Sequence, residues 1–150
     1  METIADFEDL LALLEQHEVR YLIVGGLAFI YHAKPRYTKD MDLWIDPDPE
    51  NIARANRALA DFPSPHLLSA GAVDEILQIG LAPSRVDLLQ RVGEVEFSAA
   101  WPLRVRDSYG AVQCNWVDLE TLLQIKSAID DPRHQDDAAV LREVKRLRGQ

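Results

Sequence analysis

Residues 40–45 alternate between two kinds of side chain, and this alternation constrains the fold more than any other feature of the sequence. One side carries Asp40, Asp42 and Trp44, and the other carries only the apolar side chains of the residues between and after them. A period of two is typical of a β-strand with one buried face. We therefore expect a strand that buries its aliphatic side and presents two carboxylates on the opposite face.

Other periodic segments flank this strand and predict a mixed α/β fold. We expect a helix at 4–17 and a strand at 20–24 that ends at two glycines. The other expected elements are a helix at 27–32, a helix from Asp48, strands at 66–69, 75–79 and 85–89, a short helix at 94–101, a hairpin of 103–105 with 112–116 that turns at 108–110, and C-terminal helices from Asp118 and Pro132. No repeat or long linker divides the sequence. The expectation is one α/β (α+β) domain over residues 1–150, with a mixed β-sheet flanked by helices.

The composition excludes several classes of protein. The chain has 150 residues, 47% of them hydrophobic, which is enough for a globular core. A single cysteine, Cys114, excludes a disulfide framework and indicates a reducing compartment, so we expect a cytoplasmic protein. The longest near-apolar run, at 21–31, is too short to span a membrane. A net charge of −9 argues against broad, sequence-independent DNA binding.

The two carboxylates of the alternating strand form the centre of a candidate metal site. Asp40 and Asp42 point to the same face of a strand, about 6–7 Å apart at the backbone. Two negative charges this close repel each other and are rarely placed together without a cation. Carboxylate oxygens are hard ligands that favour Mg²⁺ or Mn²⁺ over softer metals. The pair therefore predicts a divalent cation.

A third carboxylate and a glycine pair extend this candidate site. Asp87 lies among apolar residues in Arg85–Leu89, where it either joins the aspartate pair from a neighbouring strand or forms an ion pair with Arg85. Gly25 and Gly26 can bring backbone N–H groups and the start of a helix against a phosphate. Three carboxylates with two divalent ions form a site for phosphoryl or nucleotidyl transfer. Together these features indicate a nucleoside triphosphate held through magnesium.

The same residues resemble the minimal nucleotidyltransferase signature of the polymerase-β-like superfamily. The matching segments are Leu22-Ile-Val-Gly-Gly26, Arg36-Tyr-Thr-Lys-Asp-Met-Asp-Leu43, Leu77-Gln-Ile-Gly80 and Ser84-Arg-Val-Asp-Leu88, followed by the helix with Lys126. The resemblance is nearest to small bacterial proteins related to abortive-infection nucleotidyltransferase toxins. It implies a nucleotidyltransferase-like mixed sheet with helices packed on it. It also implies transfer of a nucleoside monophosphate from an NTP to a hydroxyl group of an RNA, a protein or a small molecule.

The resemblance assigns roles to individual residues. The implied catalytic and metal-binding residues are Asp40, Asp42 and Asp87, and the implied nucleotide-binding residues are Gly25, Gly26, Arg36, Thr38 and Lys126. The match weakens in residues 133–139. Asp136 fits the first aspartate of the family pattern there, but Gln135 stands in place of the usual lysine and Ala139 in place of the usual second aspartate. This departure concerns contacts to nucleotide or acceptor and leaves the metal ligands unchanged.

Two hypotheses about function follow. The first is an enzyme, a nucleotidyltransferase that needs Mg²⁺ or Mn²⁺, with ATP as the expected donor and a place in a toxin–antitoxin system. The alternative is a non-catalytic antitoxin or binding module of the same fold that masks a protein partner. The altered segment at 133–139 and the acidic composition favour this alternative. The expected partners are an NTP, an unidentified acceptor and a cognate toxin or antitoxin protein.

Overall fold

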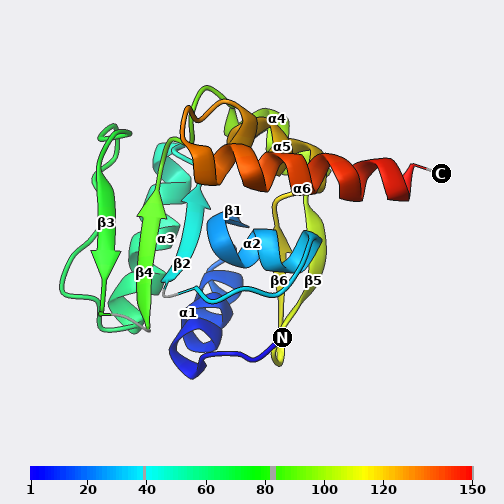
Figure 1. Ribbon diagram of the computed structural model, residues 1–150. Coiled ribbons are helices and arrows are strands. Elements are labelled where there is room, and N and C mark those ends of the chain that lie inside the picture. The colour runs from blue at the N-terminus through cyan, green and yellow to red at the C-terminus, as the bar shows by residue number, and fades with distance from the viewer. Residues whose placement is uncertain (39, 82–83, 150) are drawn as a thin grey trace.

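The computed structural model describes residues 1–38, 40–81 and 84–149. Helices alternate with strands over the first half of the chain, and two helices close the second half (Figure 1). In chain order the elements are α1 (Ala5–Gln16), β1 (Tyr21–Val24), α2 (Gly25–His32), β2 (Asp40–Ile45), α3 (Pro49–Asp61), β3 (Ile76–Ile79), β4 (Arg85–Leu89), α4 (Phe97–Ala100), a 3₁₀ turn (Trp101–Leu103), β5 (Val105–Tyr109), β6 (Val112–Trp116), α5 (Leu119–Ser127) and α6 (Pro132–Arg148).

The strands form one six-stranded sheet in the order β3-β4-β2-β1-β6-β5 (Figure 1). β2 pairs with β4, and β1 with β6, in parallel, whereas the other neighbouring strands are antiparallel. The expected mixed sheet flanked by helices is therefore confirmed. The parallel β2–β4 pair brings residues about 45 positions apart in sequence into register, and the candidate site depends on this pairing.

Helices cover both faces of the sheet. α1 and α3 pack on the face that carries Met41, Leu43 and Ile45, whose side chains are fully buried. α2, α4, α5 and α6 contribute to a second core on the opposite face, together with Leu22 and Trp44. Asp40 and Asp42 share that second face of β2 but remain partly exposed, because the core ends before it reaches them. The carboxylates thus lie at the margin of a packed layer.

The strand at 40–45 is confirmed, but the expectation of a single buried face is wrong at its far end. Trp44, expected beside the carboxylates on the open side, is only 1% exposed. Its indole ring packs edge-on against Phe97, with 5.3 Å between the ring centroids. The alternation in sequence shows which residues share a face, whereas the burial of that face depends on a segment fifty residues away.

The expectation of a strand at 66–69 is also wrong, because this segment is irregular. Its backbone is bound by a side chain instead of a neighbouring strand. The Asn56 amide on α3 donates to the Leu68 carbonyl over 2.9 Å, and its oxygen accepts from the Leu68 N–H over 2.8 Å. One side-chain amide therefore satisfies the backbone groups that a strand would have paired.

Several boundaries differ from those expected. α2 begins at Gly25, two residues before the expected start, because the glycines belong to its first turn. Leu103 lies in the 3₁₀ turn, and β5 continues through Ser108 to Tyr109, so the hairpin turns later than expected. Lys39 of the nucleotidyltransferase-like signature lies outside the described residues.

α6 extends past the edge of the sheet (Figure 1). Leu141 is fully buried in its apolar stripe, but Leu147, in the last turn, is 58% exposed. Over the described ranges, no helix combines the length and the apolar character that crossing a membrane requires.

Candidate metal and nucleotide site

The register of β2 and β4 brings the three predicted aspartates together. Asp42 is the direct partner of Asp87, and Asp40 is the partner of Arg85, so these four side chains share one face of the sheet. Carboxylate oxygens of Asp40, Asp42 and Asp87 lie within 4.8 Å of one another. The strands thus place three carboxylates close enough for a single cation to reach all of them.

The glycine pair lies directly against this acidic cluster (Asp40, Asp42 and Asp87). Val24 pairs with Asp42 across β1 and β2, so Gly25 follows at the level of the carboxylate. Gly25 has a φ of +65°, which favours glycine, and a Cβ at this position would overlap the Asp42 carboxylate. Glycine is therefore required here for the backbone to approach the cluster. The first N–H groups of α2 begin at this point and lack acceptors within the helix.

Thr38 is next to the second glycine. A Cβ on Gly26 would lie 2.8 Å from Thr38 Oγ1, and the Thr38 hydroxyl donates to the Asp40 carbonyl over 3.3 Å. The residue therefore connects the loop before β2 with both the glycine turn and the strand of the metal ligands. The structure places Gly25 against the cluster and Thr38 between Gly26 and β2, and nucleotide binding by these three residues stays a prediction.

The cluster is electrostatically strained. Burial raises the pKa of Asp42 to about 7, and the negative charges of Asp40 and Asp87 act in the same direction. Burial also raises the pKa of Asp87, against the opposing effect of the Arg85 guanidinium. Three carboxylates held this close favour either a shared proton or a bound cation.

The donor set fits a hard divalent cation. The three ligands offer only carboxylate oxygens, the type that Mg²⁺ and Mn²⁺ prefer. Asp87 Oδ1 is buried and has no hydrogen-bond partner within the described part of the chain. A buried oxygen in this state is costly unless a further ligand satisfies it. A cation bound by the cluster would do so.

Arg85 already occupies part of this space. Its Nη2 lies 2.5 Å from Asp40 Oδ2 and 3.2 Å from Asp87 Oδ2. The sequence presented two alternatives for Asp87, a place in the carboxylate cluster or an ion pair with Arg85, and the structure shows both. The signal in the sequence was the spacing, because residues two apart on a strand share a face.

Arg36 and Lys126 lie elsewhere, around a carboxylate that the sequence reading missed. Asp137 on α6 accepts from Arg36 Nη2 over 2.5 Å and from Lys126 Nζ over 2.9 Å. Burial alone would raise the pKa of Asp137, but the hydrogen bonds from Arg36 and Lys126 outweigh it and lower the pKa. Asp136, the residue aligned with the family pattern, is exposed on the same helix. The spacing of four residues to Leu141 indicates that Asp137 faces inward.

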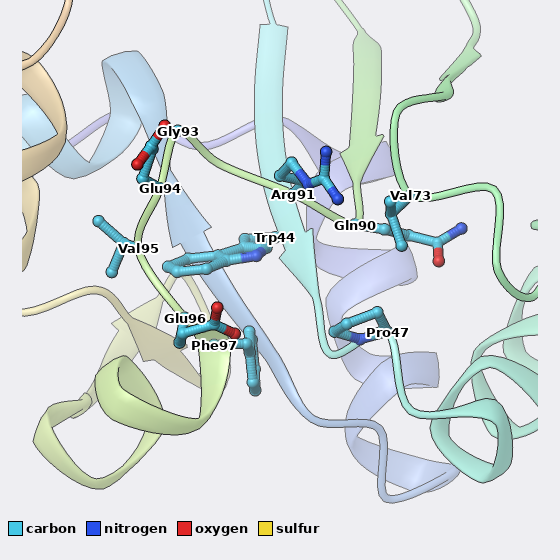
Figure 2. Close-up of a pocket in the computed structure, with 10 residues that line it drawn as sticks. All are labelled: Trp44, Pro47, Val73, Gln90, Arg91, Gly93, Glu94, Val95, Glu96 and Phe97. Atoms are coloured by element: carbon cyan, nitrogen blue, oxygen red, sulfur yellow. The ribbon is translucent and has the colours of Figure 1, made fainter.

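A cavity of about 460 Å³ lies between Trp44 and the segment that follows β4 (Figure 2). Trp44, two residues beyond Asp42 on β2, forms part of its wall, and Gln90 follows the end of β4. In Figure 2, Gln90, Arg91 and Pro47 lie on the side of the indole nitrogen, and Val95 lies on the opposite side. Trp44 is thus the wall residue that the cavity shares with the sheet face of Asp40 and Asp42.

Comparison with known proteins identifies the fold. No protein-family model matches the sequence, and no curated protein sequence matches it. The crystal structure of the lincosamide antibiotic adenylyltransferase LnuA with lincomycin bound is similar, with a TM-score of 0.63 and 15% identity over 96% of this chain and 99% of that chain.

Two further solved structures support the same conclusion. ANT(2″)-Ia in complex with adenylyl-2″-tobramycin has a TM-score of 0.60 and 13% identity, over 95% of this chain and 92% of that chain. An antigenic nucleotidyltransferase-like protein from Paracoccidioides brasiliensis has a TM-score of 0.58 and 16% identity, over 94% of this chain and 74% of that chain. The chain therefore has a nucleotidyltransferase-like fold.

Proposed function

We propose that this protein is a divalent-metal-dependent nucleotidyltransferase of the polymerase-β-like superfamily. The observation that carries the proposal is the convergence of three carboxylates, within 4.8 Å of one another, beside a glycine-initiated helix. The nucleotidyltransferase-like fold supports it, because neighbouring elements in that fold bring these residues together. The proposed reaction transfers a nucleoside monophosphate from an NTP, with ATP as the first donor to test, to an acceptor hydroxyl.

In this proposal Asp40, Asp42 and Asp87 hold Mg²⁺ or Mn²⁺. A cation held there would supply positive charge that neutralises the triphosphate and makes the acceptor hydroxyl more acidic. Gly25 and Gly26 bind triphosphate oxygens through backbone N–H groups at the start of α2. The acceptor hydroxyl oxygen bonds to the α-phosphorus and gives up its proton to solvent, the bond from that phosphorus to the bridging oxygen breaks, and pyrophosphate leaves. Asp87 lies where it can orient the acceptor hydroxyl.

For Arg36 and Lys126 we propose an indirect role in nucleotide binding. Arg36, in the loop before β2, and Lys126, on α5, both bind Asp137, so Arg36 fixes the loop to α6 while Lys126 holds Asp137 in place. Thr38 belongs to that loop and contacts the glycine turn. The network thereby positions Thr38 and, through it, the phosphate cradle.

The acceptor is an RNA, a protein or a small molecule. A small molecule is the first choice, because two structurally similar proteins carry names that describe adenylyl transfer to an antibiotic. A second candidate function is a non-catalytic module that masks the partner of a toxin–antitoxin pair. The substitutions Gln135 and Ala139 within the family pattern favour this candidate. We further propose that residues 1–150 form a single cytoplasmic domain.

Incubation with each α-labelled NTP, Mg²⁺ or Mn²⁺ and separate pools of RNA, protein and small molecules tests these functions. The enzyme proposal predicts pyrophosphate release and label in one pool, both abolished by Asp42→Asn. Arg146→Gln, which removes an exposed charge on α6 outside the cluster and the cavity, is the matched control and retains transfer. If folded wild-type protein transfers no label with any donor and pool, the masking module becomes the better account.

A further inference from the structure

We propose that Arg85 is a resident counter-cation of the acidic cluster. It holds Asp40 and Asp87 together in the metal-free protein and leaves them when a divalent cation binds. The inference rests on the proposed metal site and extends it to a positioning residue that the nucleotidyltransferase-like signature does not assign.

The register of the sheet directs the Arg85 guanidinium toward the carboxylates. Arg85 and Asp87 are two residues apart on β4, so their side chains share a face, and Val86 between them is buried on the opposite side. Asp40, directly across on β2, completes the contact. One guanidinium nitrogen binds one carboxylate oxygen of each aspartate. Charge-assisted hydrogen bonds of this kind are among the stronger ones in proteins.

Arg85 neutralises only part of the charge of the acidic cluster and bonds to only some of its oxygens. Within the described residues it bonds to no oxygen of Asp42, and its single positive charge faces three carboxylates. Asp87 Oδ1 and Arg85 Nε are both buried and have no hydrogen-bond partner in the described ranges. If the ion pair had only a structural role, both atoms would have hydrogen-bond partners, because buried polar groups in proteins generally do. Arg85 therefore occupies a position where a cation of higher charge would neutralise the cluster more completely.

Simultaneous occupancy by Arg85 and a divalent cation is unfavourable. A Mg²⁺ ion lies about 2.0–2.1 Å from its ligand oxygens. The guanidinium nitrogen already contacts one oxygen of Asp40 and one of Asp87 in a cluster only 4.8 Å across. Bound to the same oxygens, the two cations would be neighbours and would repel each other strongly at low effective dielectric. The Arg85 side chain is 38% exposed, so it can turn toward solvent when it is displaced.

The test is to titrate wild type, Arg85→Gln and Arg85→Lys with Mn²⁺ alone at pH 8. Electron paramagnetic resonance measures the free Mn²⁺ at each step. Removal of the competing guanidinium should tighten Mn²⁺ binding about tenfold or more in Arg85→Gln, and less in Arg85→Lys. Arg146→Gln removes the same charge from an exposed arginine that binds Glu143 on α6, and it should leave the affinity unchanged. Circular dichroism confirms folding, and Arg85→Lys carries the test if Arg85→Gln unfolds.

The outcomes separate this inference from the proposed function. Tighter binding in both Arg85→Gln and Arg85→Lys supports the inference, since Arg85→Lys keeps the positive charge and would bind Mn²⁺ as the wild type does if Arg85 acted only through its charge. Tighter binding in Arg85→Gln alone overturns it. Equal or weaker binding in the folded Arg85 variants, with binding by the wild type, overturns the inference and leaves the metal site standing. No Mn²⁺ binding by any folded variant overturns the metal site and the inference together.

Discussion

At the scale of single residues, the site depends on the backbone at Val24 and Gly25 as well as on its carboxylates. Gly25 adopts a φ of +65° and approaches the Asp42 carboxylate so closely that a side chain would overlap it. Asp42 in turn lies opposite Val24 through strand pairing. Under the proposed function, this close approach of backbone to carboxylate would let one metal–nucleotide complex contact both.

Gly25→Ala should therefore lose both stability and metal–nucleotide binding. The strain of a positive φ costs about 1 kcal/mol, and the overlap with Asp42 adds a further cost of about 1–3 kcal/mol. Gly93→Ala is a matched control, because Gly93 has a φ of +56° but faces open space. Urea unfolding of both variants measures the difference. Equal losses of unfolding free energy would contradict the close approach.

Asp42→Asn should stabilise the fold above neutral pH while it abolishes metal binding. Because the pKa of Asp42 is raised to about 7, the folded protein binds more protons than the unfolded chain between about pH 4 and pH 7. The unfolding free energy of the wild type should thus fall as pH rises through this window. The variant lacks this loss and should be more stable at pH 8 by about 1–3 kcal/mol.

Chemical denaturation at pH 5 and pH 8 measures this effect. Asp130→Asn, on an exposed residue, is the control and should change neither value by more than about 0.5 kcal/mol. If Asp42→Asn and the wild type had the same unfolding free energy at pH 8, the charge of Asp42 would not destabilise the fold.

At the scale of elements, the individual strands could be predicted but their pairing could not. The segments 40–45 and 85–89 are strands as expected, because their apolar residues and their boundaries are local properties of the sequence. That β2 and β4 are parallel neighbours, with Asp42 opposite Asp87, depends on the whole sheet. The sequence therefore predicted that Asp87 could join the cluster but could not exclude a simple ion pair with Arg85.

The same limit applies to α6. A helix with an apolar stripe was predictable, but the inward position of Asp137 depends on its partners Lys126 and Arg36 in other parts of the chain. The family pattern directed attention to Asp136, which is exposed. Local spacing shows which side a residue occupies, whereas only the packed structure shows which charge lies opposite.

Asp137→Ala should detach α6 from the loop before β2. It leaves the buried Lys126 ammonium without its carboxylate, and removing one partner of a buried pair costs about 3–5 kcal/mol. Glu143→Gln on the same helix breaks an exposed pair with Arg146 and should cost less than about 0.5 kcal/mol. Thermal unfolding compares the two variants. Similar melting temperatures would contradict a structural role for the network.

At the scale of the whole molecule, the fold places the acidic cluster at the margin of a packed helical layer. Trp44, two residues along the same strand, is enclosed by the second core, whereas Asp40 and Asp42 stay partly exposed. The same sheet face thus combines a rigid, apolar support with an accessible charged end. This arrangement suits a site that must hold metal ligands in fixed positions and still admit a nucleotide.

In the proposed function, the acidic cluster and the glycine turn together bind a metal–nucleotide complex. Calorimetric titration of the four NTPs with Mg²⁺, on wild type and on the Asp40→Asn/Asp42→Asn double variant, tests it most directly. We expect saturable, metal-dependent binding of at least one NTP by the wild type and none by the folded double variant. Absence of binding by folded wild-type protein, or equal binding by the double variant, would contradict the claim.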